Sequence, residues 1–545
     1  MKRFYQKSLQ FVCLLLWVFL ALVACDNSLK NERSQPLPQD PFIEVYFNLN
    51  QAKGADYSDP YRNIERPGDN LENIIINSIN SAESTIDIAV QEFRLPNIAK
   101  ALVKQAEKGI KVRIILENTY NRHLANFSPE IVRQMEPREK QRYEQYIDFI
   151  DLNDDQILSN KELAERDIFT ILNQDEISII DDTEDGSKGT GLMHHKFIII
   201  DGKVMIISSA NFTLSGVHGD FNNESTRGNA NNLLKIKSSE LAQLFTEEFN
   251  LMWGDGKGGK KDSQFGINKL KRSQKTINIG ESEVTVKFSP DSSKKDWQLT
   301  TNGFIGSVLN NAQSSINLAL FVFSDQKIAN TLESKNNQGV NIKALIDPDF
   351  IFRSYSEGLD MLGVALSNNC QYERDNKPWK EKINTVGVAN LPQGDKLHHK
   401  FAIIDDNIII TGSHNWSASA NYKNDETLLI IKNPVITKHY QQEFERLYNN
   451  STLGIPEYIN NKIQQDIKKC PSLLTQGKQE NATKIINLNT ANLAELETLP
   501  GIGKSLAERI IETRQTQPFT SLEDLTRVKG IGKSKIKKLE GKVSW

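Results

Sequence analysis

The chain has 545 residues, of which 25% are charged and 38% are hydrophobic. Its 66 lysines and arginines nearly balance its 69 aspartates and glutamates, which gives a formal net charge of -3 at pH 7. This balance excludes a basic field over the whole molecule, so any attraction of a polyanion must come from local basic patches.

Residues 1–24 predict a secretory signal. Basic residues precede an apolar run from Phe11 to Ala24, which is too short for a good membrane span but is typical of a signal peptide. An uncleaved amino-terminal anchor is the alternative, and it also leaves the rest of the chain outside the cytoplasm. The four residues that end at Cys25 (L-V-A-C) resemble a bacterial lipobox, which implies that Cys25 is acylated and becomes the first mature residue.

We therefore expect an exported protein that is lipid-anchored to a bacterial membrane, on the periplasmic or cell-surface side. Residues 25–41, which contain Ser, Asn, Gln and Pro, predict a flexible tether. Apart from Cys13 and Cys25, the chain contains only Cys370 and Cys470. An oxidising compartment would allow these two to pair, and the sequence leaves that bond open.

Residues 42–253 predict an α/β unit. A β-rich run at 84–90, a helical stretch at 98–106 and a β-rich run at 109–116 form a strand, helix, strand pattern. This pattern favours a sheet with helices on its faces. A second unit, 282–450, repeats it with similar residues at 314–320, 327–334 and 339–346. The chain is therefore an internal duplication, and we predict the α/β fold class for both halves.

The first unit contains an insertion at about 136–175 with a pattern of its own. Helical periodicity at 139–150 and 161–172 flanks a loop whose oxygen-bearing residues match the positions of an EF-hand loop. Gln156 stands where the sharp turn normally takes glycine. Two interpretations stay open, a structural calcium site and an acidic helix–helix turn without metal. The predicted calcium ligands are Asp151, Asn153, Asp155, the backbone carbonyl of Ile157, and Glu162.

Each unit also contains the pattern H-x-K-x4-D followed by Ser-x-Asn. A buried strand there would place the histidine and the lysine on one face, because alternate side chains of a strand share a face. The lysine offers a fixed positive charge for phosphate oxygens, and the imidazole can attack phosphorus or move a proton. The second histidine of each motif, His195 or His399, faces the other way and is predicted to be structural. The predicted site residues are His194, Lys196, Asp201, Ser209, Asn211, His398, Lys400, Asp405, Ser413 and Asn415.

The duplicated motif resembles the H-x-K-x4-D-x6-G-S-x-N signature of the phospholipase D superfamily, and Ser208 stands where glycine is usual. The resemblance implies two pseudo-symmetric halves in one chain, with both His-Lys pairs in one active-site cleft. It also implies phosphodiester cleavage without a catalytic metal. His194 would be the nucleophile that forms a phosphohistidine, and His398 would protonate the leaving oxygen and then activate water.

The same resemblance implies roles for the other polar residues of the motifs. The lysines and asparagines, with the two serines alongside, would hold the non-bridging oxygens and supply the electrostatic stabilisation that a metal supplies elsewhere. Glu224 and Glu426 lie in matching places, and we expect each to orient the imidazole of its own half. A solvated loop acid is the alternative for both. Asp201 and Asp405 end their strands before turn-like residues, and we expect structural support from them.

Two polar connectors separate these units. The first, 254–281, contains five glycines between 254 and 271 and is predicted to link the two halves. The second, 451–483, is predicted to link the second half to the carboxyl-terminal region, and it contains a helical piece at 458–467.

Residues 484–545 carry an independent pattern. The segment L-P-G-I-G-K at 499–504 returns as V-K-G-I-G-K at 528–533, and the region resembles a tandem helix-hairpin-helix module of the competence DNA-receptor type. A Gly-x-Gly turn that opens a helix exposes backbone N–H groups, which bind phosphate without reading bases. Basic residues dominate 527–542, which fits a polyanion-facing surface, although a solvated helical face is the alternative. The predicted DNA contacts are Gly501, Gly503, Lys504, Gly530, Gly532 and Lys533.

Three functions are consistent with these patterns. The leading hypothesis is a lipid-anchored nuclease that binds DNA without sequence preference and cleaves it through a phosphohistidine. A phospholipase D that acts on phosphatidylcholine-type lipids is the second, and the membrane attachment favours it. The third is a non-catalytic DNA-uptake receptor, and the intact His-Lys pairs in both halves disfavour it. None of the three needs a cofactor for catalysis.

Overall fold

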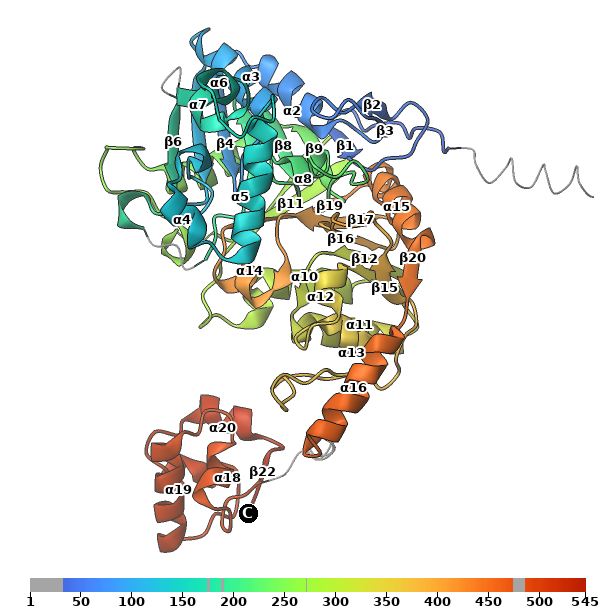
Figure 1. The fold of residues 1–545 in the computed structure, drawn as a ribbon. Helices are drawn as coiled ribbons and strands as arrows, with labels where there is room; N and C mark the ends of the chain where they lie inside the picture. The colour runs from blue at the N-terminus through green and yellow to red at the C-terminus, as the bar shows by residue number, and fades with distance from the viewer. Residues whose placement is uncertain (1–32, 174–176, 188–190, 271, 474–485) are drawn as a thin grey trace, which may run out of the picture. The chain divides into compact units, whose positions relative to one another are not determined.

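The computed structural model describes residues 33–173, 177–187, 191–270, 272–473 and 486–545 (Figure 1). The predicted signal peptide, Cys25 and the predicted tether up to residue 32 lie outside these residues. The chain forms two compact units, one made of residues up to 366 with 373–459, and one made of 367–372 with 460–545. In the part that is described, no helix is long and apolar enough to cross a membrane.

The first half of the larger unit is built on a mixed sheet with the strand order β1-β9-β8-β7-β4-β5-β6. β4 and β5 are parallel and α3 joins them, so they form the predicted strand, helix, strand pattern. The strands are β1 Ile43–Phe47, β4 Thr85–Val90, β5 Lys111–Leu116, β6 Ser178–Asp181, β7 Lys196–Ile200, β8 Val204–Ser208 and β9 Asn232–Lys237. The helices are α2 Leu71–Asn80, α3 Pro96–Ala106, α8 Leu214–Val217 and α9 Ser239–Trp253, and β2 Asp56–Ser58 and β3 Glu65–Pro67 form a separate hairpin.

The second half repeats this plan with the strand order β10-β11-β19-β17-β16-β12-β14-β15-β20. β12 and β14 are parallel and are joined by α11, as β4 and β5 are by α3. The strands are β10 Lys275–Ile279, β11 Ser282–Ser289, β12 Ser315–Leu320, β14 Asn341–Ile346, β15 Val386–Ala389, β16 Lys400–Ile404, β17 Ile408–Gly412, β19 Glu426–Lys432 and β20 Ser451–Leu453, with a short pair β13 Phe323–Ser324 and β18 Trp416–Ser417. The helices are α10 Thr301–Asn310, α11 Gln326–Asn337, α12 Pro348–Ile351, α13 Glu357–Met361, α14 Ala418–Tyr422 and α15 Pro434–Asn449.

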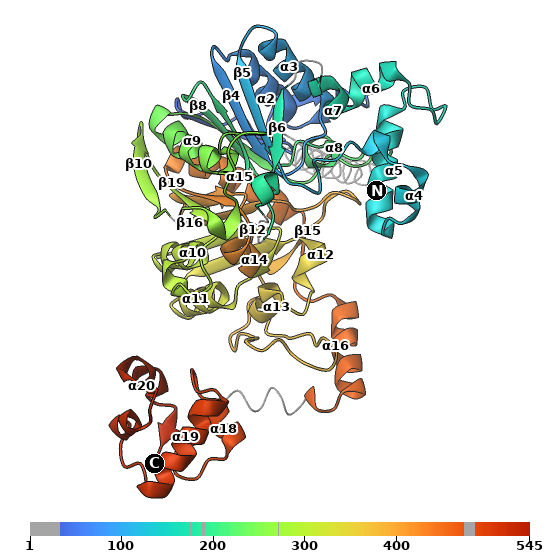
Figure 2. The same ribbon diagram turned by 90° about the vertical axis from the view of Figure 1, so that its left-hand side faces the viewer.

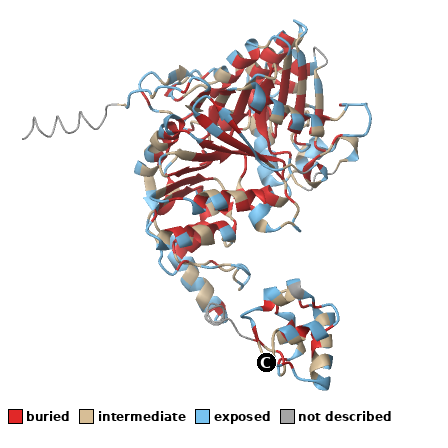
Figure 3. Cartoon of the chain, turned by 180° about the vertical axis from the view of Figure 1, so that it is seen from behind, coloured by how far each residue is buried: buried red, intermediate tan, exposed pale blue. Residues whose placement is uncertain are grey.

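The two strands that follow His194 and His398 are buried at every residue. β7 and β16 are runs of Phe, Ile and Ala after a lysine, and such continuous apolar runs suit strands that are covered on both faces. Apolar residues of α9, α15 and both sheets form one core that the halves share. Separate cores lie under α2 and α3 in the first half and under α10 and α11 in the second. Figure 3 shows the buried sheets in red beneath partly exposed helices.

The insertion in the first half is helical, and Figure 2 shows its helices α4 and α5 to one side of the first sheet. α4 (Pro129–Arg133) and α5 (Pro137–Ile150) precede the acidic loop, and α6 (Asn160–Arg166) and α7 (Ile168–Leu172) follow it. The single helix predicted over 161–172 is broken at Asp167. The carboxylate of Asp167 accepts hydrogen bonds from the Thr170 N–H at 2.8 Å and from the Tyr146 hydroxyl at 2.9 Å. Asp167 therefore caps α7 and ties it to α5.

Both predicted linkers contain edge strands of the second sheet. β10 lies within 254–281 and pairs with β11, and β20 lies within 451–483 and pairs with β15. The second half is therefore longer at both ends than the sequence predicts, and the linkers are shorter. Short, polar edge strands carry too few apolar positions to show a period in the sequence. The helix expected at 458–467 is present as α16 (Glu457–Lys469).

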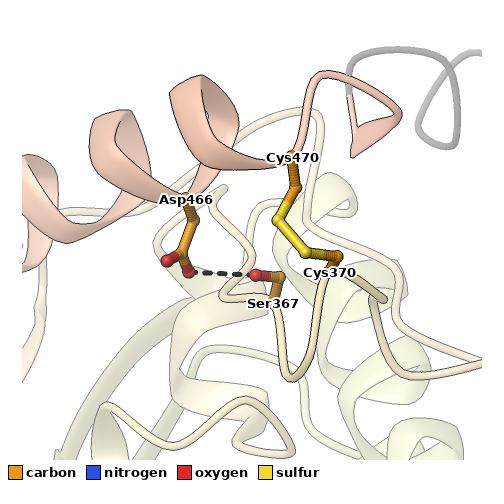
Figure 4. The surroundings of a disulfide bond; sticks show 4 residues. All are labelled: Ser367, Cys370, Asp466 and Cys470. Atoms are coloured by element: carbon orange, nitrogen blue, oxygen red, sulfur yellow. Dashed lines mark hydrogen bonds between the residues drawn. A yellow bond between two sulfur atoms is a disulfide. The ribbon is translucent and has the colours of Figure 1, made fainter.

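Cys370 and Cys470 form a disulfide, with their Cα atoms 5.6 Å apart (Figure 4). The bond joins the loop that follows α13 to the residue directly after α16. Beside it, the Ser367 hydroxyl donates a hydrogen bond to Asp466 Oδ2 at 2.9 Å. The pairing that the sequence left open is therefore made.

The carboxyl-terminal module has a hydrophobic core of its own, to which Leu496, Ile502, Ile510 and Leu525 contribute. β21 and β22 pair in parallel and bring the two ends of the module together. The elements are β21 Ile486–Asn487, α18 Leu493–Glu497, α19 Lys504–Thr516, the 3-10 helix η6 Glu523–Arg527, α20 Lys533–Leu539 and β22 Val543–Ser544.

Candidate active site

Both catalytic motifs begin where a strand of one half meets the other half. Each histidine lies two residues before the lysine that starts β7 or β16. The His194 backbone N–H donates to the carbonyl of Asp425 at 2.9 Å, and the His398 backbone N–H donates to the carbonyl of Ala230 at 3.1 Å. Each motif is thus hydrogen-bonded to a segment of the opposite half, and both motifs lie at one interface.

The histidines and lysines of the two motifs act on one another electrostatically. Burial lowers the pKa of His194 well below its usual value, and the positive charges of Lys196 and Lys400 lower it further. Burial lowers the pKa of His398 in the same way, again with a contribution from both lysines. Because each imidazole senses the lysine of the other half, the two motifs share one site. Both shifts favour the neutral form of the imidazole before substrate binds.

The two imidazoles are held by different partners. His194 Nδ1 is hydrogen-bonded to Glu426 Oε2 at 2.7 Å, and His398 Nδ1 is hydrogen-bonded to Asn231 Oδ1 at 3.0 Å. Glu426 begins β19 and Asn231 directly precedes β9, so the two partners occupy equivalent places in the halves. Both partners accept hydrogen bonds, so each ring carries its proton on Nδ1 and keeps Nε2 for the substrate.

The prediction for Glu224 is wrong. This residue is exposed in the loop after α8, and Asn231 takes the place expected for it. The prediction for Glu426 is right about an imidazole but wrong about the half, because Glu426 orients the ring of the opposite motif. A signal was present in the sequence, since the apolar run after Asn232 matches the run after Thr427. Aligning these two apolar runs pairs Asn231 with Glu426. The likeness of Asn222-Asn223-Glu224 to Asn424-Asp425-Glu426 indicates Glu224 instead, which is the wrong residue.

The two serines of the motifs support these partners. The Ser413 hydroxyl donates to Glu426 Oε2, and the Ser209 hydroxyl donates to Asn231 Oδ1, both at 2.7 Å. Each hydroxyl also accepts a backbone N–H, from Thr427 at 2.9 Å and from residue 232 at 3.0 Å. The hydroxyls are therefore engaged inside the protein. They position the groups that hold the imidazoles, and they do not face phosphate oxygens as the sequence predicted.

The two lysines are buried beside the histidines of their own motifs. Lys196 Nζ donates to the carbonyl of His194 at 2.9 Å, and Lys400 Nζ donates to the carbonyl of His398 at 2.6 Å. Lys400 Nζ also lies 4.9 Å from the centre of the Phe321 ring. Burial lowers the pKa of Lys196 to about 7 and that of Lys400 well below its usual value. Two lysines buried so close together favour an anionic ligand, because each positive charge disfavours the other.

The asparagines of the motifs keep part of their hydrogen-bonding capacity. Asn211 Nδ2 donates to Gln91 Oε1 at 3.4 Å, and the same Gln91 oxygen accepts from Lys196 Nζ at 3.4 Å. Within the described residues, the buried Oδ1 atoms of Asn211 and Asn415 have no hydrogen-bond partner. An unpaired Oδ1 can accept a hydrogen bond from a hydroxyl group of a ligand, whereas phosphate oxygens must be bound by donors such as an amide N–H or the two lysines.

The aspartates that end the motifs are structural, as predicted. The Asp201 carboxylate accepts hydrogen bonds from the backbone N–H groups of residues 83, 84 and 85 at 2.9, 2.7 and 2.9 Å. Asp405 does the same for residues 313, 314 and 315, at 2.8, 2.7 and 3.0 Å. Both adopt positive φ, 52° and 51°, in the turn after their strands. Each carboxylate therefore fixes the start of β4 or β12 and does not face the site.

The sequence matches a known protein family. The family description "Cardiolipin synthase, PLD-like domain" covers residues 75–253 and 305–448, which is more than half of the chain. The chain belongs to this phospholipase D-like family. The two matched segments are the two α/β halves, and a helix-hairpin-helix motif matches residues 481–544.

Individual relatives of this phospholipase D-like chain carry different names. A mitochondrial cardiolipin hydrolase of Xenopus tropicalis is 33% identical over 137 residues, which are 25% of this chain and 56% of that protein. A phospholipase D of Rickettsia typhi is 29% identical over 149 residues, which are 27% of this chain and 63% of that protein. The chain thus spans about half the length of the cardiolipin hydrolase it matches. A phosphatidylserine synthase structure from Haemophilus influenzae is 12% identical, with a TM-score of 0.49 over 83% of this chain and 98% of that one.

The second histidine of each phospholipase D-like motif is structural, as the strand alternation predicts. His195 and His399 are fully buried, and their Nε2 atoms are hydrogen-bonded to Glu248 and Glu443, each at 3.1 Å. These carboxylates lie on α9 and α15, so each histidine fastens its strand to the helix packed beneath it.

Sequence reasoning missed a buried ion network below the site. Lys269 of the predicted linker forms ion pairs with Glu248 and, at 2.6 Å, with Asp425. Asp425 is the residue whose carbonyl binds the His194 N–H. Lys269 therefore supports the segment that positions this histidine. A lysine in a glycine-rich stretch has the appearance of a solvated charge, and only its burial distinguishes it.

The acidic loop of the insertion has the turns of an EF-hand-like loop. Asp154 and Gln156 adopt positive φ, 59° and 63°, so Gln156 takes the conformation that favours glycine. Asp151 Oδ2 accepts the Gln156 N–H at 2.7 Å. The other predicted ligands form hydrogen bonds within the loop, between Asn153 and Asp155 and from the Ile157 N–H to Asp155.

Glu162 completes a capping box at the start of α6. Its carboxylate accepts from the Ser159 hydroxyl and N–H and from the Leu152 N–H, and these hydrogen bonds lower its pKa to about 2. Among the residues described, no group of three or more His, Cys, Asp or Glu side chains is arranged to hold a metal ion. Calcium binding stays a prediction.

In the carboxyl-terminal module, the predicted DNA contacts lie at two helix starts. Gly501 and Gly530 adopt positive φ, 79° and 102°, in the turns before α19 and α20. Gly503 and Gly532 are the N-cap residues of these helices, and neither cap has a side-chain hydrogen bond. The N–H groups of Leu506 and Lys535 donate to the carbonyls of Gly503 and Gly532, so an anion at either helix start would meet the backbone N–H groups that precede them. Lys504 begins α19; Lys533 begins α20, and its side chain lies outside the described atoms.

Proposed function

We propose that this protein is an exported, lipid-anchored nuclease that hydrolyses DNA. The observation that carries the proposal is the presence of a phospholipase D-like site and a helix-hairpin-helix motif in one chain. Phosphodiester hydrolysis follows from the family, and DNA as the substrate rests on the helix-hairpin-helix motif. A module that binds a phosphate backbone without reading bases has no evident use in lipid cleavage.

The proposed reaction starts when the two lysines bind the phosphodiester anion. His194 then attacks phosphorus through Nε2, which forms an N–P bond, and Glu426 stabilises the positive charge that develops on the ring. The bound anion offsets the lysine charges and raises the pKa of His398, so this ring can carry a proton. His398 gives that proton to the leaving oxygen as the P–O bond breaks, and it later removes one from the water that hydrolyses the phosphohistidine.

Export and lipid anchoring rest on residues 1–25, where a signal-like apolar run ends at Cys25. The disulfide between Cys370 and Cys470 supports this part of the proposal, because such bonds persist mainly in oxidising compartments.

A phospholipid hydrolase is the second candidate. The names of two relatives, a cardiolipin hydrolase and a phospholipase D, favour it. The predicted lipid anchor favours it too, because it would hold the site close to a membrane.

The test uses residues 26–545 with plasmid DNA, with heat-denatured single-stranded DNA and, in parallel, with phosphatidylcholine and cardiolipin vesicles, all in excess chelator. We expect DNA cleavage that resists the chelator and disappears in His194→Ala. Phosphatidic acid release without DNA cleavage would establish the second candidate instead. DNA binding without hydrolysis of either substrate would leave the third interpretation, a non-catalytic DNA-uptake receptor.

A further inference from the structure

A cavity of about 470 Å³ lies in the first half, against the insertion. One wall is α5, and a second is formed by the chain after β5, from Thr119 to Leu124. The third wall is the segment from Thr213 to Ser215, with Phe221. Figure 2 shows α4 and α5 projecting on the side of the sheet where α8 lies. The insertion that builds this cavity is replaced by α12 and α13 between the equivalent strands of the second half.

The cavity adjoins the catalytic residues through one pair of chain segments. Thr213 on the cavity wall is two residues from the motif residue Asn211. The Phe212 N–H between them donates to the carbonyl of Glu92 at 3.0 Å, and Glu92 also lines the cavity. Its neighbour Gln91 accepts hydrogen bonds from Lys196 and Asn211, both at 3.4 Å. The cavity wall is therefore only one or two residues along the chain from side chains that contact Lys196.

Aromatic rings form much of the cavity wall. Tyr143 on α5 is half-buried and stacks on Phe127, with ring planes 3° apart and centroids 6.1 Å apart. Tyr120 is half-buried on the opposite wall, and burial raises the pKa of its phenol, which stays protonated. Phe149 and Phe221 meet edge to face at 5.4 Å. Ring faces and phenol hydroxyls together suit a flat, polar aromatic ligand.

Arginines lie at the edge of these rings, and two of them form no ion pair in the described part of the chain. Arg122 pairs with Glu139 at 3.2 Å, whereas Arg142 donates only to Tyr120 Oη at 3.4 Å, and Arg138 is exposed without a carboxylate partner. The wall also contains carboxylates, including Glu92 and Glu136, so the cavity is not basic overall. Recognition must therefore rely on stacking, with the free guanidinium groups placed for flanking phosphates.

We propose that this cavity binds an unpaired base of the nucleic-acid strand beside the scissile phosphate, so that the substrate is DNA with a single-stranded segment at the cleavage point. The proposal rests on the proposed nuclease function. A base enters such a cavity only when it is unpaired or flipped out of its stack, which disfavours intact duplex. Acyl chains have no flat face to stack on Tyr143, so a phospholipid suits these walls less well.

The first experiment measures cleavage by Tyr143→Ala, with Arg133→Ala as the matched control. Arg133 is exposed on α4 and does not line the cavity. The substrates are a short single-stranded oligonucleotide, its blunt duplex, and a small phosphodiester without a base. We expect the KM for the single strand to rise about tenfold in Tyr143→Ala, because base–aromatic stacking is worth about 1–3 kcal/mol. Unchanged kcat/KM for the small phosphodiester shows that the variant is folded, and Tyr143→Phe should restore the KM.

A second readout does not depend on cleavage. An oligonucleotide with one 5-iodouracil beside a methylphosphonate linkage is irradiated with the full chain, and the crosslinked peptide is identified by mass spectrometry. A crosslink to Tyr120 or Tyr143 supports the proposal. Crosslinks confined to 486–545, or an unchanged KM in Tyr143→Ala, would overturn it. If the wild type hydrolyses cardiolipin vesicles but no DNA, the nuclease function itself fails, and a Tyr143→Ala defect on vesicles would assign the cavity to lipid.

Discussion

Single residues distinguish the two otherwise matching motifs. Glu426 is a carboxylate and Asn231 is a neutral amide, so the two imidazoles lie in different electrostatic environments. A carboxylate stabilises the ring that becomes positively charged on attack, and a neutral partner leaves the other ring a better proton donor. These partners support His194 as the nucleophile and His398 as the acid.

Asn231→Ala tests the positioning of His398. Without the Oδ1 acceptor the ring loses its fixed orientation, and we expect kcat for the small phosphodiester to fall about ten- to hundredfold. Asn231→Asp keeps an acceptor but raises the pKa of His398, so its pH profile should shift upward. Glu224→Ala is the matched control and should leave kcat within about twofold of wild type. Equal losses in the alanine variants would contradict the placement of both residues.

The pH dependence should follow the buried lysine of the first motif. Burial lowers the pKa of Lys196 to about 7, although Glu426 and Glu92 oppose this. Lysine is charged below its pKa, so the phosphate-binding charge of the free enzyme is present below about pH 7 and is lost above it. We therefore expect kcat/KM to decrease as pH rises above about 7. Because the pKa of His194 is lowered, we expect the loss of kcat/KM on the acid side to occur at a lower pH than an ordinary histidine would give. A kcat/KM that increases up to about pH 9 would exclude this account.

At the level of secondary structure, both halves contain the same link, in which an aspartate joins the end of one strand to the start of another. Asp201 and Asp405 make matching hydrogen bonds to matching backbone segments. The halves differ in what is inserted after the second strand, where the first half has α4 to α7 and the second has α12 and α13. The scaffold is therefore shared, and the walls of the aromatic cavity belong to the first half alone.

Asp201→Ala should affect stability and leave catalysis intact. Burial raises the pKa of this carboxyl, but hydrogen bonds from residues 83–85 outweigh it and lower the pKa. The stabilisation is therefore present above about pH 4 and is lost as pH falls below it. Removing the acceptor should reduce the free energy of unfolding by about 2 kcal/mol. Denaturant unfolding at neutral pH measures this, and a reduced kcat in the folded variant would instead place Asp201 in the reaction.

At the level of the whole molecule, the disulfide and the carboxyl-terminal module extend the catalytic halves. The disulfide joins residues that are 100 positions apart in the sequence, and both cysteines belong to the smaller of the two compact units. The module that follows has a separate core and its own two helix-start turns. Under the proposed function, DNA capture and DNA cleavage would therefore fall to different parts of one chain.

Replacing both Cys370 and Cys470 by serine should lower stability by about 2–4 kcal/mol, because closing a long loop restricts the unfolded chain. Guanidinium unfolding with and without a reducing agent measures the effect. The reductant should destabilise the wild type and leave the double variant unchanged. Activity on the small phosphodiester should persist in both, since neither cysteine belongs to the site.

Removing 484–545 should raise the KM for DNA and weaken its salt dependence, because fewer phosphate contacts release fewer counterions. The kcat/KM for the small phosphodiester should not change. Cleavage assays at two salt concentrations measure both effects. An unchanged KM for DNA would separate the module from substrate capture and remove the main support for a nuclease.

The sequence by itself determined what is local or repeated in this protein. The strand, helix, strand pattern, the paired motifs, the turn aspartates and the two Gly-x-Gly helix starts depend on short-range periodicity, conformation and spacing. Only the tertiary structure decided that Glu426 serves His194, that Asn231 replaces Glu224, and that Lys269 belongs below the site. The edge strands, the disulfide and the aromatic cavity were decided there too. These features join segments that are far apart in the chain, and their pairing is set by how those segments pack together, which no local pattern records.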